Sequence, residues 1–71
     1  MMLSQLKPGD LAKVISIEGG HGLRQKLHLR GITEGSIIRV ISCHGPITVE
    51  VGRGIVSIGR GIAQRIQVMR L

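Results

Sequence analysis

The sequence predicts a mostly β fold: a small barrel of five to six strands with one short α-helix inserted after the first strand. Two observations lead to this prediction. Short runs rich in Ile, Val and Leu recur along the 71 residues, and glycine-containing turns separate them, as in small all-β folds. One run alone, at residues 23–30, has leucines at helical spacing instead. Because closure hides the strand edges that an open sheet exposes, a barrel is favoured over a flat sheet.

The 71 residues are predicted to form a single domain, 1–71, near the lower size limit for folding without disulfides or metals. A core of this size rarely supplies more than about 3–5 kcal/mol, so each buried aliphatic side chain matters. Cys43 is the single cysteine, which excludes an intrachain disulfide and fits a reducing cytosol. No apolar run reaches the roughly 20 residues of a membrane span, and no signal-peptide pattern opens the chain. We therefore expect a cytoplasmic protein without direct membrane insertion.

The chain contains an internal repeat. The stretch 6–16 aligns without gaps on 32–42, and a Gly, a basic residue and Val-Ile-Ser recur at a spacing of 26 residues. Each copy has an apolar anchor, a tight turn at Gly9 or Gly35, and then a strand, because glycine takes a positive φ without steric cost. Duplication and convergence of two similar turn-to-strand corners both explain the pattern. The two copies predict the first two strands, at 11–17 and 37–43.

One short helix is predicted between these two strands, at residues 23–30. Leu23 and Leu27 lie at i, i+4 spacing and face the barrel, and Gly31 supplies a C-terminal cap. The glycine-rich loop 19–22 before the helix resembles a phosphate-binding loop, since helix N-termini attract anions. It lacks the Gly-Lys-Ser/Thr sequence that ends such loops. We therefore expect neither a nucleotide site nor any other cofactor.

The C-terminal part of the chain is predicted to form hairpins. Residues 47–51 alternate apolar and polar side chains, as a half-buried strand does. The Gly-Arg-Gly triplets at 52–54 and 59–61 resemble RNA-binding repeats, but a predicted strand separates them, which favours two hairpin ends. The remaining elements are predicted as a strand at 55–58, a helical turn at 59–64 and a strand at 65–69.

Apolar residues occupy both faces of the first two predicted strands. In the first strand, Ala12 and Val14 alternate with Ile15 and Ile17. This pattern is typical of strongly bent strands that are shared between two halves of a small barrel. Together with the inserted helix, which would cover one open side, it favours an SH3-like barrel.

The composition excludes some classes of partner. The chain has no aromatic residue, so it lacks the rings on which single-stranded bases stack and the aromatic groove that captures Pro-rich peptides. A net charge of +6 nevertheless suggests nucleic acid or an anionic membrane surface. The basic residues fall singly, apart from Arg24, Lys26 and Arg30, as on an ordinary solvated face. We expect no specific nucleic-acid recognition.

No residue pattern indicates catalysis or a metal site. The acidic residues are scattered without paired carboxylates, and no Ser or His has an orienting partner, so we expect no enzyme activity. Cys43 and His44 are adjacent, and His21 precedes the predicted helix. Neighbouring strand side chains point to opposite faces, and no spacing typical of a metal site is present. Cys43 is more simply a small apolar residue at a strand end.

Short motifs follow one another in a characteristic order over nearly the whole chain. They are Leu6-Lys7-Pro8-Gly9, Ile17-Glu18-Gly19-Gly20, Leu27 through Gly31-Ile32, Glu34-Gly35, Gly45-Pro46-Ile47, Val49-Glu50-Val51 and Ala63-Gln64-Arg65-Ile66-Gln67-Val68. In this order and spacing they resemble the FeoA family, small cytoplasmic accessory proteins of bacterial and archaeal ferrous iron transport. The resemblance implies an SH3-like barrel that docks on the GTP-binding cytoplasmic part of a FeoB-type membrane iron transporter. A related barrel forms the C-terminal domain of iron- and manganese-dependent transcriptional regulators.

Two positions depart from the pattern of that family. Many members have Pro at the place of Glu34, and an apolar residue often precedes the glycine that ends the helix, where this chain has Arg30. If that second position contacts the transporter, the mode of contact differs in this chain.

The predicted helix is the expected partner surface. Leu29 projects away from the barrel among basic and polar side chains, and an apolar centre with a polar rim is typical of a docking patch. A single exposed Leu is also ordinary on a protein surface. The predicted partner-binding residues are Arg24, Gln25, His28, Leu29 and Arg30.

These observations predict a non-enzymatic accessory protein of ferrous iron uptake that docks on and modulates a FeoB-type transporter. The alternative is a small basic barrel that binds nucleic-acid backbone. A third interpretation, the detached barrel of a metal-dependent regulator, is disfavoured because no DNA-reading helical domain is present. The strand residues Ile37, Ile41 and Met69 offer an aliphatic surface for a homodimer.

Overall fold

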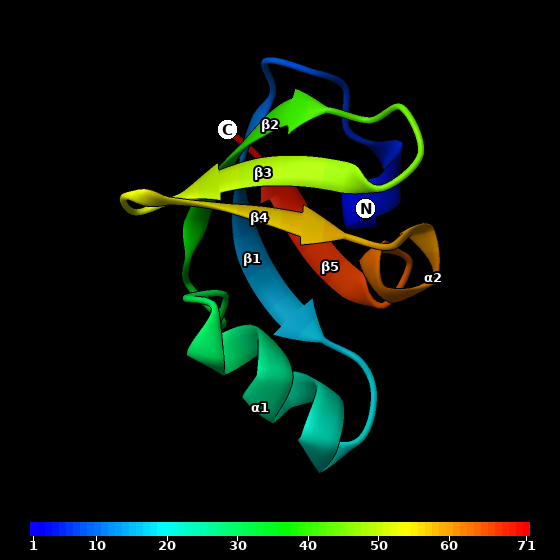
Figure 1. Ribbon diagram of the computed structural model, residues 1–71, viewed down its shortest axis with the longest axis vertical. Helices are drawn as coiled ribbons and strands as arrows, with labels where there is room; N and C mark the ends of the chain where they lie inside the picture. Colours follow the sequence, from blue (N-terminus) through cyan, green and yellow to red (C-terminus); the bar gives the residue numbers. More distant parts are fainter.

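A strongly curved antiparallel sheet carries one helix along its side (Figure 1). The structure, a computed structural model, describes residues 1–71. Its elements are the 3-10 helix η1 (Leu3–Gln5), β1 (Leu11–Ile17), α1 (His21–Leu29), β2 (Ile37–Ser42), β3 (Ile47–Val51), β4 (Gly54–Ile58), α2 (Arg60–Ala63) and β5 (Ile66–Arg70). The strands lie in the order β4-β3-β2-β1-β5. The predicted mostly β fold with a helix after the first strand is confirmed.

The observed element boundaries differ slightly from the predicted ones. Helix α1 begins at His21, two residues before the predicted start, because Gly20 already has the extended conformation of an N-cap, with φ −73° and ψ 166°. Strand β2 ends at Ser42 and leaves Cys43 outside it. The short helix η1 is absent from the sequence prediction, because three residues are too few to show a periodic pattern.

The two copies of the internal repeat bind each other in the same way: the glycine turn of each copy forms hydrogen bonds with the strand of the other, β1 or β2. The N–H of Gly9 donates to the carbonyl of Val40 at 2.8 Å, and the N–H of Gly35 donates to the carbonyl of Val14 at 2.7 Å. The amides of the two valines in turn donate to the turn of the opposite copy. Gly9 and Gly35 have φ angles of +92° and +93°, which confirms the predicted glycine turns. Each turn therefore extends the ladder of the other copy's strand.

The core consists only of aliphatic residues, sixteen in number. Its members are Leu3, Leu6, Ala12, Val14, Ile17, Leu27, Ile32, Ile38, Val40, Ile47, Val49, Val56, Ile58, Ala63, Ile66 and Val68. A register shift in β1 between Val14 and Ser16 changes the side-chain phase, so that Ile17 also points inward. The apolar residues on the second face of the first two strands are not shared between two halves of a barrel: Ile15 of β1 and Ile37 and Ile41 of β2 are 47%, 49% and 44% exposed.

The two outer strands of the sheet, β4 and β5, differ in whether their outer edges are covered. No strand pairing joins β4 to β5, so the barrel closes through side-chain packing in the common core. The outer edge of β5 is covered by the chain's own N-terminus: Met1 and Val68 exchange backbone hydrogen bonds with N···O distances of 3.3 and 2.7 Å, and Met2 bridges Gln67. The outer edge of β4 pairs with no strand of this chain.

Helix α1 follows β1, and a Schellman motif at its C-terminal end leads the chain back to the barrel. The N–H of Ile32 donates to the carbonyl of Leu27, and the N–H of Gly31 donates to that of His28, both at 2.9 Å. Gly31 has φ +88°, as the predicted C-terminal cap requires. Leu27 and Ile32 are 5% and 1% exposed, so an apolar contact accompanies the motif. The C-terminal end of α1 is thereby fixed on the barrel.

The start of α1 depends on a glycine with a positive φ. We expect Gly19→Ala to lower the free energy of unfolding by about 1–3 kcal/mol. Gly19 has φ +143°, and an added Cβ would lie 2.8 Å from Cδ2 of Leu23, the residue that packs the first turn of the helix against the core. The change in unfolding free energy is measured by urea denaturation followed by far-UV circular dichroism.

Gly22→Ala is the matched control for this prediction. Gly22 lies inside α1, and nothing stands within 4 Å of its added Cβ. Alanine is the better helix former by about 0.8–1 kcal/mol, so this variant is expected to be as stable as the parent chain or more stable. A Gly19→Ala variant that is no less stable than Gly22→Ala would contradict the account of this turn.

Candidate functional site

Helix α1 is held on the barrel by one face and exposes the rest. Leu27 is buried and Leu23 packs partly against the core, as the sequence predicts. Leu29 is 80% exposed, the highest value among the large apolar side chains. Lys26 and Arg30, in or just after the last turn, are also exposed. The free surface of the helix is therefore apolar at Leu29 and basic beside it.

An apolar groove of about 420 Å³ lies between α1 and the strand β4, and we call it the α1–β4 groove. Ten residues line it, six of them hydrophobic, and Lys26 and Arg30 are the only charged ones. Those on which the argument depends are Lys26, Leu29 and Arg30 beside Val56, Ile58 and Ile62. The groove thus combines an apolar floor with a wholly basic rim.

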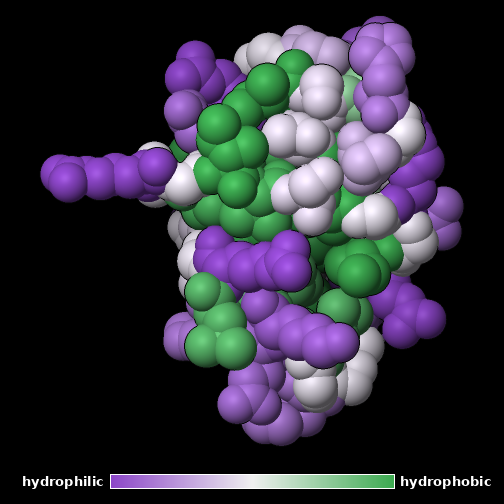
Figure 2. All heavy atoms as spheres, viewed as in Figure 1, coloured by the Kyte–Doolittle hydropathy of each residue, from purple (hydrophilic) through white to green (hydrophobic).

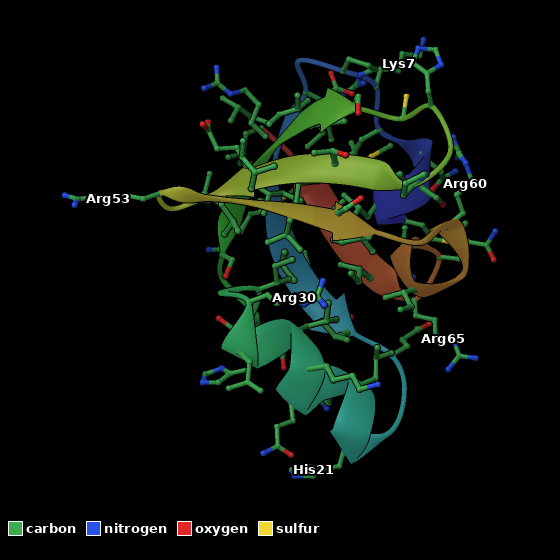
Figure 3. The ribbon with its side chains drawn as sticks, viewed as in Figure 1. Lys7, His21, Arg30, Arg53, Arg60 and Arg65 are labelled. Carbon is green, nitrogen blue, oxygen red and sulfur yellow. The ribbon has the colours of Figure 1, made fainter.

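The space-filling view shows the same combination on one face of the molecule. Figure 2 shows apolar surface over the strands and near α2, further apolar surface on α1, and hydrophilic side chains lying across the space between them. Arg30 projects between α1 and the strands (Figure 3). Of the other labelled basic side chains, Lys7, Arg53 and Arg65 point outward from different sides of the barrel (Figure 3), and Arg60 donates to the carbonyl of Cys43. The positive charge is therefore dispersed, as the sequence predicts, except beside the groove.

A second hollow of about 470 Å³ lies against α1 and is more polar. Arg24, Gln25 and His28 line it together with His21 and Glu34. Arg24 donates to the carboxylate of Glu34 in an ion pair. The two side chains are 48% and 53% exposed, so the pair adds at most about 1 kcal/mol to stability. Its main consequence is to hold the Arg24 side chain across this hollow.

The structure divides the predicted partner-binding residues between two places. Leu29 and Arg30 line the α1–β4 groove, whereas Arg24, Gln25 and His28 line the polar hollow. The departure at Glu34 from the family pattern supplies the carboxylate that holds Arg24. The predicted surface is therefore two adjoining surfaces separated by the exposed ridge of the helix.

Sequence reasoning missed the far wall of the groove. Val56, Ile58 and Ile62 line it from β4 and α2, more than twenty residues beyond the predicted helix. The sequence predicts β4 only as a strand, and its residues Val56 and Ile58 are 8% and 3% exposed. The one signal in the sequence that could have indicated this wall was Ile62, an apolar residue in the predicted helical turn. In the structure its side chain is 38% exposed.

A further apolar surface covers the outside of the sheet, and we call it the outer sheet face. Its members are 44–50% exposed: Leu11, Ile15, Ile37, Ile41 and Met69. Lys13 lies opposite Ile37 on one side and opposite Met69 on the other, so positive charge interrupts the apolar residues. A homodimer through this face stays a prediction.

The acidic side chains take part in structural contacts. Asp10 accepts a hydrogen bond from the backbone N–H of Lys7 at 2.8 Å, which closes the first glycine turn. Glu50 pairs with Arg39 at 2.8 Å across the β2–β3 ladder. With Glu34 on Arg24, three of the four acidic residues thus have partners of this kind.

No group of three or more His, Cys, Asp or Glu side chains comes together in an arrangement that could hold a metal ion. His21 lies at the far end of α1 (Figure 3). Cys43 packs partly against the core, and its carbonyl accepts a hydrogen bond from Arg60. This environment is that of a small apolar residue after a strand end. No helix of the chain has the length and apolar character needed to cross a bilayer.

Comparison with known proteins places this arrangement in a family. The model of the FeoA domain family matches residues 1–70. A Methanocaldococcus jannaschii protein described as an Fe(2+) transport protein A is 36% identical over 67 residues, which cover 93% of this chain and 82% of that protein. The crystal structure of an iron uptake regulatory protein (FeoA) superposes with a TM-score of 0.93 at 44% identity, covering 100% of this chain and 96% of that one.

The same fold occurs inside a larger protein. A manganese-dependent transcriptional repressor in complex with manganese superposes with a TM-score of 0.91 at 28% identity. The match covers 100% of this chain but 36% of the repressor chain. The predicted SH3-like class of small barrel is confirmed by these superpositions.

Proposed function

This chain belongs to the FeoA domain family, and from that membership we propose that it is a non-enzymatic cytoplasmic accessory protein of ferrous iron transport. It docks on the GTP-binding cytoplasmic part of a FeoB-type membrane iron transporter. The observation that carries the docking role is the α1–β4 groove, where exposed Leu29 lies beside an apolar floor and a basic rim. An apolar centre with a polar rim is the usual composition of a protein–protein interface.

The proposed partner surface extends from the groove over the helix. Leu29 and Arg30 make the apolar and basic contacts in the groove, and Arg24, Gln25 and His28 provide polar contacts at the neighbouring hollow. Arg24 is already held by Glu34, so little side-chain freedom is lost when it is bound. Since only Leu29 among these residues is strongly apolar, it is the expected centre of the interface.

The accessory role follows from differential affinity. A bound protein shifts the equilibrium of its partner only if it binds one state better than another. If the chain modulates the transporter, its affinity for the cytoplasmic part must therefore depend on the nucleotide bound there. Equal affinity in both nucleotide states would leave docking intact and exclude modulation by this route.

Titration calorimetry with the transporter's cytoplasmic part tests the proposal. We expect saturable binding, different affinities with GDP and with a GTP analogue, and a change of less than about tenfold between 50 and 200 mM salt. A protein that neutralises 6–10 phosphates of duplex DNA loses about 10³–10⁵ in affinity over the same range. Absence of transporter binding, together with strongly salt-dependent binding to duplex DNA or RNA, would replace the proposal by the nucleic-acid alternative.

A further inference from the structure

Strand β4 has an unpaired edge beside the α1–β4 groove. Strands β3 and β4 form an antiparallel hairpin in which Val51 lies opposite Gly54, so two residues make the turn. Residues that flank a two-residue turn exchange hydrogen bonds, and hydrogen-bonded pairs then alternate along the ladder. Gly54 and every second residue after it therefore direct their N–H and C=O groups toward β3. Ile55 and Ser57 direct theirs outward, where no strand of the chain pairs with them.

The β4 edge lacks the devices that usually protect edge strands. Soluble proteins commonly place Lys, Pro or a bulge on an edge, or cover it with another segment. Strand β4 reads Gly-Ile-Val-Ser-Ile, without charge or Pro, and its ladder with β3 has no register shift. Ile55 on this strand is 68% exposed. The opposite edge, on β5, is covered by Met1 and Met2, so the chain protects one edge and leaves the other open.

The charge around this edge has one sign. Lys26 and Arg30 line the α1–β4 groove, and no acidic residue does. A smaller hollow along the outer side of β4 is lined by Arg30 and four residues of that strand. Arg53 extends from the tip of the β3–β4 hairpin (Figure 3). An occupant with negative charge is therefore favoured, and a second copy of this chain, which also carries +6, is disfavoured.

We propose that β4 accepts an extended acidic segment of a protein partner as an added strand. The N–H and C=O groups of Ile55 and Ser57 pair with the backbone of that segment, as in β-strand addition to an exposed sheet edge. Its apolar side chains enter the α1–β4 groove, and its carboxylates pair with Lys26 and Arg30. The inference rests on the docking role proposed above and names the chemistry of the docked segment: alternating apolar and acidic residues.

Capped synthetic heptapeptides of alternating Asp and Val test the strand addition on the unmodified chain. We expect this probe to bind and a probe of alternating Lys and Val to bind at least about tenfold more weakly. Two further probes carry N-methyl groups on the Asp amides or on the Val amides, because only one of these alternate sets faces β4 in a given strand direction. We expect one of the two to lose at least about tenfold in affinity. N-methylation removes backbone donors and leaves acceptors on β4 unpaired, which carries a penalty of this order. Equal affinity of the methylated and unmethylated probes would overturn the proposal.

Two variants at one position of the protein test the same edge without changing the probe. Ser57→Pro removes an N–H group that points outward, and Pro is tolerated on edge strands where the N–H faces solvent. Ser57→Ala removes only the side-chain hydroxyl group and keeps that backbone donor. We expect Ser57→Pro to weaken binding of the Asp–Val probe at least about tenfold and Ser57→Ala to change it by less than about twofold. If Ser57→Pro does not fold, as judged by circular dichroism, the methylated probes alone test the strand addition.

Amide hydrogen exchange separates this inference from the proposed function. With the transporter's cytoplasmic part bound, the amides of Ile55 and Ser57 are expected to exchange at least about tenfold more slowly than in the free chain. Binding without this protection would overturn strand addition and leave the docking role standing. Binding of the Asp–Val probe without binding of the transporter would support strand addition and overturn the docking role. Protection that rises with concentration of the chain alone would assign the edge to self-association and overturn the proposal.

Discussion

Ile38→Ala is expected to leave most of the chain unfolded at 25 °C. Ile38 is 1% exposed and lies on β2, between Ala12 on one neighbouring strand and Val51 on the other. Truncation of a buried Ile to Ala lowers stability by about 2–5 kcal/mol, and the core of a domain of this size rarely supplies more than about 3–5 kcal/mol. The loss is therefore comparable to the whole stability of the fold.

Ile37→Ala is the matched control for Ile38→Ala. It changes the same residue type on the same strand, but Ile37 points to the outer sheet face and is 49% exposed. We expect a loss of at most about 1 kcal/mol, from lower β propensity and partial loss of contacts. Because the chain has no Trp or Tyr, urea unfolding is followed by far-UV circular dichroism. Similar unfolding midpoints for the two variants would show that the core is assigned to the wrong face of β2.

Leu29→Glu is expected to weaken binding to the transporter's cytoplasmic part at least about 30-fold. A residue that acts as a hot spot of an interface costs about 2 kcal/mol or more when truncated, which corresponds to this factor. Leu29 is the expected hot spot because it is the one strongly apolar residue of the proposed partner surface. The introduced carboxylate also repels the acidic segment proposed for the groove. Because Leu29 is 80% exposed, the fold itself is expected to remain intact. Titration calorimetry measures the affinity, and circular dichroism checks the fold.

Leu71→Glu is the control for Leu29→Glu. It introduces the same charge in place of the same residue type at another exposed position, 62% exposed at the C-terminus. We expect its affinity for the transporter to change by less than about twofold. If Leu29→Glu and Leu71→Glu weakened binding equally, net charge rather than the α1–β4 groove would govern the interaction.

The local structure of this chain was largely predictable from its residues. The glycines at 9, 31 and 35 identified two turns and a helix cap, and their φ angles lie between +88° and +93°, where only glycine is free of steric strain. The predicted first and third strands match β1 and β3 residue for residue. The exposure of Leu29 followed from its position opposite Leu23 and Leu27 on a helix of 3.6 residues per turn. Each of these inferences needs only neighbours along the chain.

The far wall of the partner surface was not predictable in this way. Leu29 and Ile62 line one groove although 33 residues separate them, and no local pattern connects them. The phase of the β3–β4 ladder follows from its two-residue turn, but the sheet order decides that β4 is an edge. The same order decides that the N-terminus covers β5 rather than β4.

The sequence by itself determined the turns, the cap, the strands and the apolar face of most of them, because these depend on steric limits and side-chain period. The tertiary structure alone decided which edge stays open and which apolar residues share a groove with Lys26 and Arg30. The physical reason is that periodicity tells which face of an element is buried but not which element covers it. That choice depends on how the whole sheet curves around its core.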